Sequence, residues 1–337
     1  MKKFKSILVT GGAGFIGSHV VRRLLKQYPD CQIINLDSLT YAGNLENIKD
    51  CQNATNHHFK KESINNFEIL QSLFKTYGFD AVVHLAAESH VDNSIKNPLG
   101  FAETNIQGTL NLLEVARQNW ENHSQQNRFY HISSDEVFGS LGIEGQFNED
   151  SSYDPRSPYS ASKAASDHLV RAYYHTYGLP VLISNSSNNY GPAQHTEKLI
   201  PLMIQNIVNQ QSLPVYGKGE NIRDWLFVED HAEAIDLILH KGDIGESYVI
   251  GGNNEQRNID VVQRLIEIID RLLNRPKGTS KSLVNFVADR LGHDYRYAID
   301  ASKIKRKLGW EPKTSFELAI EETVKDYFKN NNIKLNY

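Results

Sequence analysis

SILVTGGAGFIGSHV, residues 6–20, joins a short β-branched run to a helical pattern through a glycine-rich turn. Gly12, Gly14 and Gly17 have the spacing G-x-G-x-x-G, in which glycines let the backbone turn tightly and approach a pyrophosphate at the helix N-terminus. Asp37 ends the next apolar run, where a carboxylate can hold a ribose 2′-hydroxyl and repels a 2′-phosphate. The stretch therefore predicts a dinucleotide-binding βαβ unit that prefers NAD to NADP.

Apolar runs and helical patterns alternate through the first half of the chain. This alternation predicts an α/β fold with a doubly wound parallel sheet, a Rossmann domain. Strands are expected at 6–10, 32–36, 80–85, 128–133 and 180–184, and helices at 15–27, 67–77, 101–119 and 158–177. Beyond residue 190 the pattern is mixed. We expect residues 1–190, with returning segments near 225–250 and 300–315, to bind the dinucleotide, and residues 191–337 to form mainly a smaller mixed α/β substrate domain.

Composition excludes several classes of function. The 337 residues carry 36 Lys and Arg against 40 Asp and Glu, a net charge of −4, which gives no electrostatic reason to expect nucleic acid or an anionic membrane as partner. No apolar stretch approaches the ~20 residues that span a bilayer. The two cysteines, Cys31 and Cys51, form no disulfide framework. We expect a cytoplasmic protein with no metal site.

A tyrosine and a lysine share one face of the helix expected at 158–177. Ser157 can cap this helix and Gly178 can end it. Tyr159 and Lys163 are four residues apart, so the lysine ammonium can lower the pKa of the phenol and make it a base. A surface Tyr/Lys pair is the alternative interpretation.

Two adjacent carboxylates follow the strand expected at 128–133. In HISSDEVFGS (131–140), Ser134 precedes Asp135 and Glu136. Such acids are common at a helix start, where they offset the helix dipole. They can also divide the roles of general acid and general base if their surroundings separate their pKa values. The residues alone leave both interpretations open.

Several motifs together resemble a known family. They are NLDSLTYAGNLENI (35–48), HLAAESHVD (84–92), SSDEVFG (133–139), PYSASKAASDH (158–168), SNNYGP (187–192), LPVYGKGENIRDWLFVEDH (213–231) and DRLGHDYRYAID (289–300). From Ser6 to about Lys329, the chain resembles the extended short-chain dehydrogenase/reductases, and among them the dTDP-glucose 4,6-dehydratases. These enzymes convert dTDP-glucose to dTDP-4-keto-6-deoxyglucose and water, and the resemblance suggests deoxysugar biosynthesis such as a rhamnose pathway.

The resemblance assigns roles to the residues singled out above. Tyr159, helped by Lys163 and Ser134, would take the C4-hydroxyl proton while hydride passes from C4 to a tightly bound NAD⁺. Glu136 would remove the C5 proton, Asp135 would protonate the departing C6 hydroxyl, and hydride would return to C6. Epimerisation needs no such acids, which argues against a sugar epimerase. A UDP-glucose 4,6-dehydratase and a catalytically silent NAD-binding sensor remain alternatives.

The resemblance also implies a cofactor site, a substrate site and a dimer. The cofactor residues would be Gly11, Gly12, Gly14, Phe15, Ile16, Gly17, Asp37, Ser38, Leu39, Thr40, Gly43, Ser63, Ile64, Leu85, Ala86, Ala87, Ser89, Thr104, Tyr159, Lys163 and Asn189. The substrate residues would be Ser89, His90, Ser134, Asn188, Glu197, Lys198, Leu199, Pro214, Tyr216, Arg223, Asn258, Asp289, Arg290 and His293, with both arginines clamping the diphosphate. The helices at 101–119 and 158–177 would pair into a four-helix bundle in a homodimer, unless their apolar stripes only cover the sheet.

The sequence departs from the family pattern at a few positions. Ser63 replaces a carboxylate expected at the adenine, and Asn93 stands where an arginine is usual. Ala193, His195 and Thr196 replace aromatic residues and a proline, which puts the preference for dTDP over UDP in doubt.

Overall fold

A seven-stranded parallel sheet forms the centre of the larger part of the molecule in the computed structural model, which describes residues 2–120, 126–289 and 292–334. Its order is β10-β6-β5-β4-β1-β2-β3, and every neighbouring pair is parallel. The strands are β1 (Ser6–Thr10), β2 (Gln32–Leu36), β3 (His57–Lys60), β4 (Ala81–His84), β5 (Arg128–Ser134), β6 (Val181–Ser186) and β10 (Ser247–Ile250). The predicted doubly wound sheet and its five strands are confirmed, and β3 and β10 are additional.

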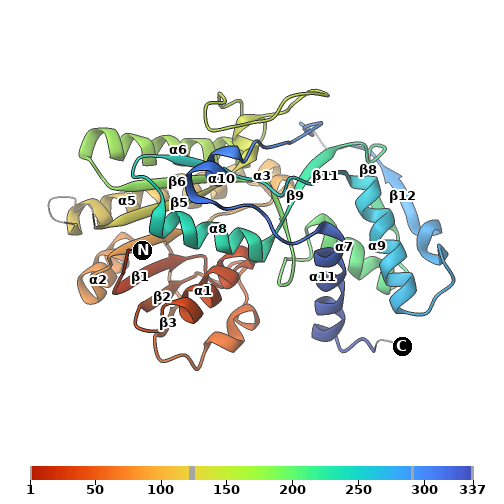
Figure 1. Cartoon of the computed structure of the whole chain (residues 1–337), viewed down its shortest axis with the longest axis horizontal. Coiled ribbons are helices and arrows are strands. Elements are labelled where there is room, and N and C mark those ends of the chain that lie inside the picture. Colours follow the sequence, from red (N-terminus) through yellow and green to blue (C-terminus); the bar gives the residue numbers. More distant parts are fainter. Residues whose placement is uncertain (1, 121–125, 290–291, 335–337) are drawn as a thin grey trace.

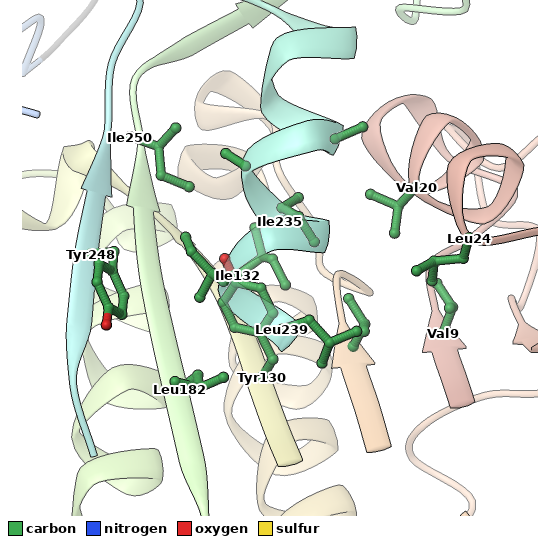
Figure 2. Close-up of a cluster of buried hydrophobic side chains, with 14 of the residues drawn as sticks. Val9, Val20, Leu24, Tyr130, Ile132, Leu182, Ile235, Leu239, Tyr248 and Ile250 are labelled. Carbon is green, nitrogen blue, oxygen red and sulfur yellow. The ribbon is translucent and has the colours of Figure 1, made fainter. Parts of the chain in front are cut away.

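Helices cover both faces of this sheet (Figure 1). They are α1 (Phe15–Gln27), α2 (Phe67–Tyr77), α5 (Gly108–Asn119), α6 (Pro158–Tyr177) and α8 (Val228–Lys241). On one face, Ile235 and Leu239 of α8 lie beside Tyr130 and Ile132 of β5 in a buried cluster (Figure 2). Successive strand residues point to opposite faces, so Leu8 belongs to a separate cluster on the other face.

Local sequence explains the helix bounds around the site. In α6, Ser157 and Ser160 form a capping box, and Gly178 ends the helix with a φ of 67°. The helix predicted at 101–119 is longer and irregular: α4 (Pro98–Phe101), a π-helical segment η2 (Ala102–Gln107) and α5 follow one another without a break.

A second hydrophobic cluster lies at the other end of the molecule (Figure 1). It draws on α7 (Leu199–Val208), β8 (Leu213–Tyr216), α9 (Asn258–Leu272) and α11 (Phe316–Asn330), with β8 paired to β12 (Val284–Val287). A three-stranded sheet of β7 (Asn188–Tyr190), β9 (Ile222–Phe227) and β11 (Glu255–Arg257) accompanies it. The segment 228–250 returns to the large sheet: β10 is its edge strand beside β6, and α8 packs on one face. The helix α10 (Ser302–Leu308) packs on β10.

The remaining elements are short. They are η1 (Leu45–Cys51), α3 (Val91–Lys96), η4 (Asp135–Phe138) and η5 (Thr279–Leu283). Within the described ranges, every helix is too short or too polar to cross a membrane.

Candidate active site

A cavity of about 850 Å³ opens at the carboxyl ends of the parallel strands. All five predicted catalytic residues line it. So do most predicted cofactor residues: Gly11, Gly14, Phe15, Ile16, Gly17, Asp37, Ser38, Thr40, Gly43, Ser63, Ile64, Leu85, Ala86, Ala87, Ser89, Thr104 and Asn189. Asn188, Glu197 and Lys198 of the predicted substrate set also line it. One cavity thus joins the glycine loop to the acid pair.

The glycine loop is shaped so that a side chain would not fit. Gly11 has a φ of 74°, and a Cβ there would lie 2.7 Å from the backbone nitrogen of Ala86. A Cβ on Gly17 would lie 2.1 Å from the Gly11 carbonyl oxygen. Gly12 does not line the cavity, but a Cβ there would collide with the side chain of Asn35. No side chain caps α1, so its first-turn N–H groups remain available for a pyrophosphate.

Asp37 is held at the end of β2 by the backbone. Its Oδ2 accepts a hydrogen bond from Ala13 N at 2.9 Å, and its Oδ1 accepts one from Leu39 N at 2.8 Å. Each carboxylate oxygen keeps a further lone pair for a ribose hydroxyl. Leu39 supports Asp37 in this way without lining the cavity. Together with the tightly packed glycines of the loop, this arrangement fits NAD.

The end of β5 presents the two acids to the cavity. Ser134 is the N-cap of η4: its Oγ accepts a hydrogen bond from Glu136 N at 3.2 Å and donates one to Asp135 Oδ1 at 3.4 Å. The helix-start interpretation of the acids is therefore correct as a local description. Asp135 is nevertheless only 2% exposed, and its Oδ2 has no hydrogen-bond partner among the described residues.

The surroundings of Asp135 favour its protonated form. Burial, and then the nearby charges of Glu136 and Asp224, raise the pKa of Asp135 well above its usual value. The Asp224 carboxylate is itself buried and accepts hydrogen bonds from the backbone nitrogens of Gly252 and Asn254. A carboxyl that stays protonated at neutral pH can donate a proton to a leaving hydroxyl.

Tyr159 and Lys163 are buried on the cavity side of α6, but the expected lowering of the tyrosine pKa was wrong. Burial, and then the charge of Glu136, raise the pKa of Tyr159, while a hydrogen bond with Ser134 opposes the rise. Lys163 Nζ donates to the carbonyl oxygen of Ile132 at 2.8 Å. Burial lowers the pKa of Lys163 to about 8, so desolvation outweighs the pairing of phenol and ammonium that the spacing suggested.

Several predicted substrate residues do not line this cavity. They are His90, Leu199, Pro214, Tyr216, Arg223, Asn258, Asp289 and His293. Arg290 lies outside the described residues. The diphosphate clamp at Arg223 stays a prediction. In this structure its guanidinium donates to the carbonyl oxygens of Ile222, Asp294 and Tyr295.

Some of these outlying residues form a second polar group. Tyr216 OH donates to Asp92 Oδ2 at 3.2 Å, and its ring meets that of His293 edge-on with centroids 6.0 Å apart. His293 Nδ1 lies 2.5 Å from Asp289 Oδ1. This group joins the segment after β12 to α3 of the larger part.

The sequence did not indicate every residue around the acids. Tyr297 is buried with Arg223 stacked 4.2 Å from its ring centre, and burial followed by the charge of Glu136 raises its pKa. Tyr41 and Glu88 line the cavity. All three lie in motifs quoted above, Tyr41 in 35–48, Glu88 in 84–92 and Tyr297 in 289–300, but nothing in the sequence singled them out. Among described residues, no group of three or more His, Cys, Asp or Glu side chains is placed to hold a metal ion.

Comparison with known proteins places this geometry in a family. The model described as GDP-mannose 4,6 dehydratase matches residues 8–323. The chain is 51% identical to the dTDP-glucose 4,6-dehydratase of Salmonella typhimurium, over 97% of this chain and 95% of that protein. It is 50% identical to that of Haemophilus influenzae, covering 96% of this chain and 98% of the relative.

A solved dTDP-glucose 4,6-dehydratase from Streptomyces venezuelae, with NAD among its bound ligands, has a similar fold. It superposes with a TM-score of 0.90 at 45% identity, covering 97% of this chain and 98% of that one. The chain therefore belongs to the dTDP-glucose 4,6-dehydratase family.

Proposed function

We propose that this protein converts dTDP-glucose to dTDP-4-keto-6-deoxyglucose and water, with NAD as its resident cofactor. The observation that carries the proposal is the acid pair of buried Asp135 and half-buried Glu136, in one cavity with Tyr159 and the glycine loop. An epimerase has no need of a second proton donor. A sensor would need the loop but not the acids.

Each polar side chain then has a separable task. Bound NAD supplies an acceptor and later a donor of hydride. Tyr159, hydrogen-bonded to Ser134, takes the proton of the C4 hydroxyl. Its raised pKa means that the phenolate needs positive charge nearby, which the ammonium of Lys163 contributes.

The acid pair performs the elimination. Glu136 takes the C5 proton, which the 4-keto group makes acidic. Asp135 gives its proton to the C6 hydroxyl, which leaves as water, so that a double bond joins C5 and C6. Hydride then returns to C6, and Glu136 gives its proton back to C5, which completes the 4-keto-6-deoxy product. Their common position at the end of β5 lets both face the same hexose, and the raised pKa of Asp135 keeps the acid and base roles distinct.

A mass-spectrometric assay tests this proposal. The purified protein with NAD⁺ should convert dTDP-glucose to a product lighter by one water. Glu136→Gln should abolish that loss, and Glu144→Gln, at an exposed loop position, should not. Parallel incubation with UDP-glucose tests the alternative base, and scoring for the 4-epimer tests epimerisation. A folded, NAD-binding protein that alters neither nucleotide sugar would contradict the proposal and favour the silent sensor.

We also propose a homodimer formed through a four-helix bundle. α5 and α6 lie side by side and contact each other (Figure 1). Leu99 is 80% exposed just before this helix pair, Ala161 of α6 is exposed, and Ile106, Leu110 and Leu169 are half-buried. Such an apolar stripe is typical of a surface that a second copy covers.

The division of labour between the two ends of the molecule is part of the proposal. The sheet end, with the returning segments 225–250 and 300–315, would bind NAD, and the remainder of 191–337 would bind most of the nucleotide sugar. The separate hydrophobic clusters of the two ends support this division. Both cysteines are free and buried, which suits the cytoplasm as the compartment.

A further inference from the structure

A buried carboxylate that the proposed reaction does not use lies one helical turn beyond Lys163. Asp167 is fully buried on α6. Its Oδ2 accepts three hydrogen bonds, from Ser133 Oγ at 2.9 Å, Tyr153 OH at 2.8 Å and Asn185 Nδ2 at 3.1 Å. A carboxylate with this many donors is held in one orientation.

The same group fixes three successive residues at the end of β5. Lys163 Nζ donates to the carbonyl oxygen of Ile132 at 2.8 Å. Asp167 accepts from the hydroxyl of Ser133. Asn185 Nδ2, which also donates to Asp167, donates to the carbonyl oxygen of Ser134 at 3.2 Å. The next two residues along the chain are the catalytic acids, so a shift of this strand end would move them.

We propose that Asp167 is a positioning residue for the dehydration: its carboxylate holds the Lys163 ammonium in its charged form and fixes the strand end that presents Ser134 and the acid pair. The proposal rests on the dehydratase function proposed above. Asp167 touches no substrate in this scheme, and it acts through Lys163 and β5.

The two histidines near Asp167 are neutral, so they do not compete with Lys163 for the charge of the carboxylate. His131 Nε2 lies 3.2 Å from Asp167 Oδ1. Burial lowers the pKa of His131 to about 4, so this imidazole is neutral at physiological pH. His84, whose ring is 5.2 Å from that of His131, is likewise kept neutral by burial.

The remaining titratable groups lie to either side. The Tyr153 hydroxyl donates a hydrogen bond to Asp167, and Arg171 of α6 donates to the Tyr153 hydroxyl at 3.5 Å. Burial raises the pKa of Asp167, but hydrogen bonding to His131 and Ser133 and the charge of Lys163 outweigh burial and hold that pKa below its usual value. Asp167 is therefore an anion, and among the described residues its charge is the one that opposes the effect of burial on the pKa of Lys163.

The test is the pH dependence of kcat for Asp167→Asn. Without the carboxylate, Lys163 should lose its proton at lower pH, because burial has already lowered its pKa to about 8. The alkaline limb of the profile should move down by about one pH unit, which is about fivefold less activity at pH 8, with KM little changed. Asp167→Glu should restore part of the limb.

Two matched variants separate positioning from general stability. Asp270→Asn removes another buried carboxylate, which accepts from Ser280 in the smaller part, and should lower the melting temperature without moving the limb. Tyr153→Phe removes one donor and keeps the charge, so it should lower kcat without moving the limb. An Asp167→Asn profile that keeps the wild-type alkaline limb overturns the inference. Wild-type protein that dehydrates no nucleotide sugar overturns the proposed function instead.

Discussion

Replacing Asp135 by asparagine should stabilise the protein while it destroys activity. Burial raises the pKa of this acid, so the folded chain keeps a proton that the unfolded chain loses above about pH 4. The wild type therefore has its full stability below pH 4 and loses stability as pH rises through the folded pKa. Asparagine is neutral at every pH, so the variant does not lose stability in this way as pH rises.

The size of the effect follows from proton linkage. Between pH 4 and the folded pKa, the advantage of Asp135→Asn should grow by about 1.4 kcal/mol for each pH unit. In a protein of this size, that corresponds to roughly 2 °C in melting temperature per unit. Loss of the general acid should lower kcat about 10²-fold to 10⁴-fold.

The assay is thermal unfolding of both proteins at matched NAD concentration between pH 4 and pH 7. Glu144→Gln, at an exposed site, serves as the control and should show a flat difference from wild type. The slope of the difference is decisive, because a fixed cost of the new amide group does not change with pH. A difference that stays constant or shrinks from pH 5 to pH 6.5 would refute the assignment of Asp135 as the protonated acid.

Three further changes test other parts of the site. Gly17→Ala should cost about 1–3 kcal/mol and weaken NAD binding at least tenfold by calorimetry, because its Cβ would lie 2.1 Å from a backbone oxygen, whereas Gly142→Ala has open space and should be neutral. His195→Ala removes an edge contact with Tyr41 at the cavity wall, so KM for the nucleotide sugar should rise about threefold to tenfold with kcat unchanged in steady-state assays. Leu169→Arg puts a charge into the proposed dimer face and should yield monomers in light scattering; an unchanged dimer would place the interface elsewhere.

Hydrophobic periodicity was enough to find most of the large sheet, because a parallel strand buried on both faces is apolar along its length. It missed two strands: one is not apolar along its length, and the other is apolar but lies in a segment with no regular pattern. His57–Lys60 is half-buried throughout at the sheet edge. Ser247–Ile250 is buried and joins β6 from more than sixty residues away, at a point where the surrounding sequence is mixed.

Residue type was enough to select the proposed catalytic side chains, but it did not predict their electrostatics. Tyr159 and Lys163 do share a helical face, yet burial of the phenol, and then the charge of Glu136, raise the pKa of the tyrosine. Arg223 was selected for a property of its type, the fork of donors that suits phosphate. In the structure, backbone carbonyl oxygens accept from that fork, and no spacing in the sequence indicates this.

Asp167 is a residue whose role could not be predicted from its spacing along the helix. Tyr159, Lys163 and Asp167 stand at successive four-residue steps, so one stripe of α6 carries a phenol, an ammonium and a carboxylate. The spacing was visible, but an acid at this position reads as a solvated helix residue until the strand beside it is known. Because β5 supplies Ser133 as a donor, and β6 supplies Asn185, the carboxylate becomes a buried anion. The sheet therefore determines the charge that the helix brings to Lys163, and a change on β6 such as Asn185→Ala should disturb the acid pair without touching it.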